Sequence, residues 1–130
     1  MTFIFNDGGR KAAGYKGVAN DCGARAMSIA LSLNYKSVYK ELAQANKDCG
    51  GKRSAREGLY RNVYSDVLKK YGWIWMKAPK FAGRKARCSD LQGTVIAKLA
   101  HHFVAVINGV PQDIFDCSNK MVYGYWAKQP

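Results

Sequence analysis

The spacing of the apolar residues changes once along this 130-residue chain, near Gly72. Before that glycine, apolar residues recur three and four positions apart, which is typical of helices that bury one face. After it, they alternate or form short runs rich in Val, Ile and aromatic residues, which indicates strands. Helices followed by antiparallel strands predict an α+β domain, with N-terminal helices packed on a C-terminal antiparallel sheet.

Three helices are expected in the first part of the chain. The first opens at Cys22, the second is capped by Ser37 and ends before Gly50, and the third runs over about 57–71. The dipeptide Asn108-Gly109 predicts a tight hairpin in the later part. The expected strands there are 73–76, 94–99, 102–107, 110–115 and 121–126.

Length and composition favour a single domain over residues 1–130. An apolar content of 48% is enough to build one core. The apolar start at 1–5 is too short for a signal peptide, and no run approaches the ~20 apolar residues of a membrane span. We therefore expect a cytoplasmic protein without a membrane partner.

Cys22 is the first candidate for chemistry. It follows Asn20 and Asp21, either of which can accept hydrogen bonds from the free amides of the first helical turn. Those amides and the helix dipole favour a thiolate, so Cys22 is expected to be nucleophilic. Cysteines 49, 88 and 117 form no CxxC pair and are expected to be buried apolar residues. Neither a metal nor a cofactor is expected.

A nucleophilic thiol needs a base, and the doublet His101-His102 opens an apolar strand late in the chain. With a two-residue hairpin loop, His101 lies opposite Asp116, and His102 has Asp113 on its diagonal. One more residue in the loop would place His102 opposite Asp116. The sequence leaves this register open.

These features resemble the papain-like cysteine peptidase superfamily. The segment Cys22-Gly23-Ala24-Arg25-Ala26 is similar to the ovarian-tumour deubiquitinases. The Asp-Cys-Gly start, the His-Phe-Val-Ala-Val strand and the closing Asp116 are similar to the bacteriocin-processing peptidase domains of bacterial exporters. The order of motifs over most of the chain also resembles short bacteriophage proteins, which implies a phage-encoded protein in the host cytoplasm.

The resemblance implies a papain-like fold and a Cys-His-Asp triad that hydrolyses a peptide or isopeptide bond in a protein or peptide substrate. It assigns Cys22 as nucleophile, His102 as base and Asp116 as the acid that orients it, with His101 and Asp113 in reserve. The family places a glutamine of the oxyanion hole six residues before the cysteine, where this chain has Lys16. Asn20 is therefore expected to take that role, together with the Cys22 amide.

Charge supports a second hypothesis. The net charge is +12, and residues 52–87 hold eleven basic residues against two acidic ones, with aromatic residues among them. Such a surface can neutralise phosphates and stack bases. The alternative is thus a catalytically inactive papain-like protein that binds nucleic acid, an acidic protein or a host factor. Its candidate binding residues are Lys52, Arg53, Arg56, Arg84, Lys85 and Arg87.

Overall fold

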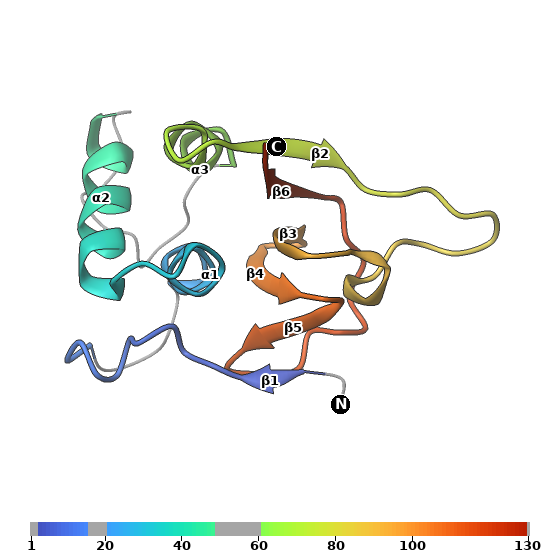
Figure 1. The fold of residues 1–130 in the computed structure, drawn as a ribbon, viewed down its shortest axis with the longest axis horizontal. Coiled ribbons are helices and arrows are strands. Elements are labelled where there is room, and N and C mark those ends of the chain that lie inside the picture. The colour runs from blue at the N-terminus through green and yellow to red at the C-terminus, as the bar shows by residue number, and fades with distance from the viewer. Residues whose placement is uncertain (1–2, 16–20, 49–60, 130) are drawn as a thin grey trace.

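The computed structural model of the chain describes residues 3–15, 21–48 and 61–129. Within these ranges the chain forms an α+β fold with three α-helices and a sheet of six strands (Figure 1). None of these helices is long and apolar enough to cross a membrane. The helices are α1 (Cys22–Leu31), α2 (Tyr35–Asp48) and α3 (Arg61–Lys69), and a 3₁₀ helix η1 spans Cys88–Asp90. The strands are β1 (Ile4–Phe5), β2 (Trp73–Lys77), β3 (Thr94–Leu99), β4 (His102–Ile107), β5 (Val110–Asp113) and β6 (Gly124–Lys128).

The strands lie in the order β1-β5-β4-β3-β6-β2. All neighbours are antiparallel except β1, which pairs parallel to β5. The expected antiparallel sheet is therefore corrected to a mixed sheet. Strand β1 was not predicted, because two apolar residues near the start of a chain carry no alternating pattern; it forms only by pairing with the outer edge of β5.

Both faces of the sheet are covered, and the central strands are apolar on both sides for that reason. The three helices lie on one side, and the segments that connect the strands cover the other (Figure 1). Along β3 the side chains alternate between the two layers: Ile96 belongs to the core under the helices, whereas Val95 and Ala97 belong to a second core. That second core also contains the buried thiols of Cys88 and Cys117.

The boundaries of several elements differ from the expected ones. The second helix starts at Tyr35 and is capped by Asn34 rather than by the expected Ser37, because the Asn34 side chain accepts a hydrogen bond from the Ser37 amide at 3.1 Å. The strand expected at 110–115 ends at Asp113, and the one expected at 121–126 occupies 124–128. The third helix is described from residue 61 onward.

The β4–β5 hairpin has a two-residue loop. Asn108 and Gly109 both have positive φ, 51° and 82°, as this tight turn requires. Ala105 pairs with Gln112 and Val106 with Pro111, which is the register of the two-residue loop. The register that the sequence left open is thus the one that places Asp113 diagonal to His102.

Candidate functional site

Cys22 is the first residue of α1, and α1 packs on β4 at the centre of the sheet. Its amide is one of the first-turn N–H groups that a helix cannot satisfy internally. The Tyr64 hydroxyl of α3 donates a hydrogen bond to the Gly23 carbonyl at 2.7 Å and ties this end of α1 to its neighbour. Asp21 occupies the cap position but makes no capping hydrogen bond with its side chain, contrary to expectation. Asn20 and Lys16 lie outside the described residues.

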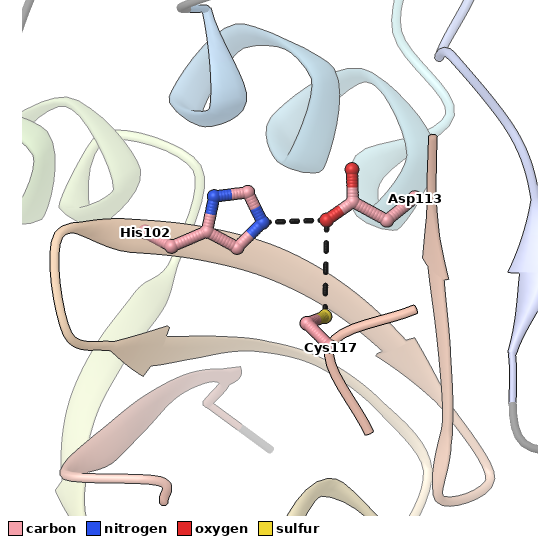
Figure 2. Close-up of side chains that lie close together, drawn as sticks. All are labelled: His102, Asp113 and Cys117. Carbon is pink, nitrogen blue, oxygen red and sulfur yellow. Dashed lines mark hydrogen bonds and ion pairs between the residues drawn. The ribbon is translucent and has the colours of Figure 1, made fainter. Parts of the chain in front are cut away.

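His102 and Asp113 face each other across the β4–β5 hairpin. His102 is the first residue of β4 and Asp113 is the last of β5. The imidazole Nε2 lies 2.5 Å from the Asp113 Oδ2, and Figure 2 shows the ring edge directed at that oxygen. The Asp113 side chain is 3% exposed and that of His102 is 13% exposed. The imidazole is therefore the more exposed member of this pair, and the carboxylate is the more deeply buried one.

The Cys22 thiol completes a row of three groups. Its sulfur lies close enough to the His102 side chain and to the backbone of Phe103 for both groups to lower the pKa of the thiol. Because Asp113 holds Nε2, the ring nitrogen left for the thiol is Nδ1. The imidazole of His102 thus lies between the Cys22 sulfur of α1 and the Asp113 carboxylate of β5.

The charges in this row support one another. Burial disfavours the Cys22 thiolate, but the hydrogen bond and charge of His102 outweigh burial and hold the pKa of Cys22 below its usual value. Burial also disfavours the imidazolium, yet hydrogen bonds, first of all the one to Asp113, raise the pKa of His102 to about 11. Burial of Asp113 is likewise outweighed by His102, and the pKa of that carboxyl is lowered. The site therefore favours a thiolate–imidazolium pair.

The acid that contacts His102 is Asp113, the reserve candidate, rather than Asp116. Asp116 lies beyond the end of β5 and is exposed, and its Oδ1 accepts a hydrogen bond from the Ser118 amide at 2.9 Å. His101 is exposed in the β3–β4 turn, where its φ is 52°. The two-residue register of the β4–β5 hairpin explains the choice of acid, since it brings Asp113 and not Asp116 to the imidazole.

Arg25 is a member of the site that the sequence did not reveal. It is 3% exposed, and its guanidinium pairs with Asp113 Oδ1 and, at 3.1 Å through Nε, with Asp21 Oδ1. Asp21 is 1% exposed. Its carboxylate also accepts a hydrogen bond from the Tyr35 hydroxyl and forms an ion pair with Arg10 at 3.1 Å. The spacing of four between Asp21 and Arg25 on one helix was the available signal. Arg25 thus connects the start of α1 to the carboxylate of the triad.

A second thiol lies beside the same carboxylate. Cys117 is 1% exposed, as expected for a buried apolar residue, and its Sγ lies 3.8 Å from Asp113 Oδ2 (Figure 2). Ligand atoms of Cys117, His102 and Asp113 all lie within 4.8 Å of one another. No sequence pattern indicates this cluster, because Cys117 stands in the connection after β5 and no spacing motif links it to the other two.

Of the basic candidates, the structure describes Arg84, Lys85 and Arg87, and the contacts of Arg84 and Arg87 lie away from Cys22, His102 and Asp113. Lys52, Arg53 and Arg56 lie outside the described residues. The Arg84 guanidinium binds both carboxylate oxygens of Asp90, at 2.8 and 2.9 Å. Arg87 donates to the Asn119 carbonyl at 2.6 Å, whereas Lys85 is exposed.

The aromatic residues among those basic residues are divided between core and surface. Tyr64 and Trp73 are 0% and 6% exposed, so neither offers a ring face to a base. Phe81 is 38% exposed, but the Arg84 guanidinium lies 3.8 Å from its ring centroid. Within the described residues, the expected surface of interleaved basic and aromatic side chains is therefore only partly present.

Comparisons of this chain with protein-family models, with curated proteins and with solved structures find no match. The functional argument therefore depends on the chemistry of the site itself.

Proposed function

We propose that this protein is a cysteine-dependent hydrolase on a single papain-like domain, acting on a peptide or isopeptide bond through Cys22, His102 and Asp113. The observation that carries the proposal is the row in which the Cys22 sulfur adjoins the imidazole of His102 and the imidazole contacts the buried carboxylate of Asp113. A nucleophile, a base and a group that orients the base are the three components of covalent catalysis by such triads.

In the first step, the Cys22 thiolate attacks the carbonyl carbon of the scissile bond, and the carbonyl π electrons move to its oxygen. The imidazolium of His102 then gives its proton to the leaving amine through Nδ1, the nitrogen on the thiol side. Asp113 keeps the other nitrogen, Nε2, protonated and so fixes the tautomer. Water, deprotonated by the now neutral His102, cleaves the thioester and restores the thiolate.

The tetrahedral oxyanion needs donors near the sulfur. We assign the backbone N–H of Cys22, which stands at the start of α1 where helix amides are free. The Asn20 side chain is proposed as the second donor. Both groups belong to the segment that leads into α1, so one helix start supplies nucleophile and oxyanion hole together.

The substrate is proposed to be a protein or peptide with acidic character near the cleaved bond, because the net charge of this chain is +12. An apolar contact is available beside the triad. Phe115 is 46% exposed, and its ring centroid lies 5.0 Å from that of His102. An apolar side chain next to the scissile bond would pack on Phe115. Action in a host cytoplasm, after phage infection, belongs to the same proposal.

The test is the rate at which a chloroacetamide reagent labels Cys22 below pH 7, followed by intact mass. An ordinary thiol of pKa about 8.5 is mostly protonated there and reacts slowly. We expect fast single labelling that is absent in Cys22→Ala and at least ~10-fold slower in His102→Ala, since the imidazolium no longer stabilises the thiolate.

The acid is tested with a matched pair of variants. Asp113→Asn is expected to slow labelling, because the amide cannot stabilise the imidazolium, whereas Asp116→Asn should label at the wild-type rate. Labelling of Cys22 no faster than that of an ordinary thiol would refute the hydrolase and leave a papain-like binding protein. Equal effects of the two asparagine variants would refute the assignment of Asp113.

A further inference from the structure

We propose that His102, Asp113 and Cys117 form a binding site for Zn²⁺. The three side chains come from β4, from the end of β5 and from the connection that follows β5, and Figure 2 shows the imidazole and the Cys117 sulfur both directed at one Asp113 oxygen. They offer one nitrogen, one oxygen and one sulfur donor, all within 4.8 Å of one another. Of these, only Cys117 has no part in the proposed catalytic row.

The donor set suits zinc. Imidazole, carboxylate and thiolate are its usual protein ligands, at about 2.0–2.1, 2.0–2.2 and 2.3 Å. With tetrahedral angles these bond lengths place oxygen and sulfur roughly 3.5 Å apart. The Asp113 Oδ2 to Cys117 Sγ distance is 3.8 Å. The Nε2–Oδ2 contact of 2.5 Å must widen when the ion replaces the shared proton.

Charge and burial also agree with a divalent ion. Asp113 and Cys117 are 2% and 1% exposed, and Arg25 already faces Asp113 Oδ1, so a thiolate formed beside this carboxylate needs a further positive charge. A carboxylate and a thiolate neutralise Zn²⁺, and His102 adds a neutral nitrogen. Three protein donors leave the fourth tetrahedral position for water, as in open zinc sites.

Binding would exchange protons for the ion. Zn²⁺ forms bonds to Cys117 Sγ, Asp113 Oδ2 and His102 Nε2, and the protons on Sγ and Nε2 leave to solvent. The remaining ring proton stays on Nδ1. If the proposed hydrolase is correct, this neutral ring cannot serve as the acid for the leaving amine, so the zinc-bound form is inactive. The binding itself does not depend on that function.

The experiment is a Co²⁺ titration of the Cys22→Ala protein, with Zn²⁺ added afterwards as competitor. Cobalt replaces zinc in tetrahedral sites and gives a thiolate-to-metal absorption band when sulfur is a ligand. We expect this band in Cys22→Ala and its loss when Zn²⁺ is added. Because this variant lacks the proposed nucleophile, the result is separate from any test of hydrolysis.

Two further substitutions identify the sulfur in the Cys22→Ala background. Cys117→Ser should abolish the sulfur band and weaken binding at least ~10-fold, which is the usual scale of a disturbed metal site. Cys88→Ser is the matched control, since Cys88 is 0% exposed in the same core as Cys117. That control should retain the band, and circular dichroism should show that both variants are folded.

Asp113→Asn provides a second route if Cys117→Ser does not fold, because it removes the charged oxygen and leaves all thiols in place. It should weaken cobalt binding ~10-fold or more while a residual sulfur band persists. A Cys22→Ala protein without the band would overturn the site. A band that survives Cys117→Ser would also overturn the site. A band seen only in the wild type would overturn it as well, because it would place the ion on Cys22.

Discussion

Arg25 shows how a single buried side chain organises this site. Its guanidinium lies between the carboxylates of Asp21 and Asp113 and is 3% exposed. Both carboxylates are themselves almost fully buried. A planar, permanently charged group with several donors can bind two acids at once, which the ammonium of a lysine does less well. Arg25 therefore acts as a positioning residue, which holds the oxygen of Asp113 that His102 does not use.

Replacing Arg25 by methionine is expected to destabilise the protein by about 3–5 kcal/mol, because it leaves two buried carboxylates short of a positive partner. Urea unfolding followed by circular dichroism measures this loss. Arg84→Met is the control: Arg84 also binds an aspartate, but at an exposed position, and its loss should change stability little. Equal losses in the two variants would contradict the role given to Arg25.

At the scale of single residues, the sequence predicted part of the site. Cys22 and His102 were identified because a helix start and a strand start are local patterns. Asp113 was the reserve because the family resemblance favours Asp116, and the sequence does not determine the hairpin register that decides between them. Arg25 was not predicted, since a charged side chain within a helix is most often solvent-exposed and only the tertiary contacts show that this one is buried.

The β4–β5 hairpin is the element that brings the imidazole and the carboxylate together. Its turn is held against η1: a Cβ built on Gly109 would lie 3.2 Å from the Ser89 carbonyl oxygen. The φ of Gly109 is also positive, at 82°. Both the backbone conformation and the close approach therefore require glycine at this position.

Gly109→Ala and Gly83→Ala separate these two requirements. Gly83 has a similar φ of 80° but no atom within 4 Å of its built Cβ. The free energy of unfolding should fall by about 1 kcal/mol in both variants, because alanine is strained in the left-handed backbone conformation. In Gly109→Ala it should fall by a further ~1 kcal/mol or more, because the new methyl group crowds Ser89. Urea unfolding gives both values. If the two variants are equally stable, the turn does not pack on Ser89 as described.

At the scale of elements, prediction succeeded where a pattern is local. The strands expected at 94–99 and 102–107 have the observed bounds, because each is a β-rich apolar run with turn residues at its end. Strand β1 was missed because two residues form no period, and β6 was placed early because Tyr123 and Met121 look strand-like but lie in the preceding connection. The papain-like arrangement of these elements stays a prediction.

The whole molecule should respond to acid through its buried carboxylate. Burial of Asp113 is outweighed by its contacts with His102, so its folded-state pKa lies below the unfolded value of about 3.9. A lowered folded pKa contributes stability that is present above the unfolded pKa and is lost as pH falls through the folded one. The free energy of unfolding should therefore decrease as the pH falls below about 4.

Asp113→Asn should be less stable than the wild type at neutral pH but lose less stability on acidification. Urea unfolding at several pH values between neutrality and ~3 gives both curves. Asp116→Asn, with its exposed side chain, should follow the wild-type curve. If the free energy of unfolding of Asp113→Asn changes with pH as it does in the wild type, groups other than Asp113 govern acid unfolding.

The pairing of β1 with β5 joins the start of the chain to a hairpin that is synthesised much later. Ile4 and Phe5 pair with Gln112 and Asp113, and the Asn6 amide donates to the Asp113 carbonyl at 2.9 Å. During translation at ~5–20 residues per second, Cys22 leaves the ribosome roughly 4–16 s before His102. Until then the nascent chain carries a thiol without its base, and β1 has no strand to join. In the proposed hydrolase, the thiol is therefore expected to remain unreactive towards peptide bonds near the exit tunnel until the hairpin has emerged.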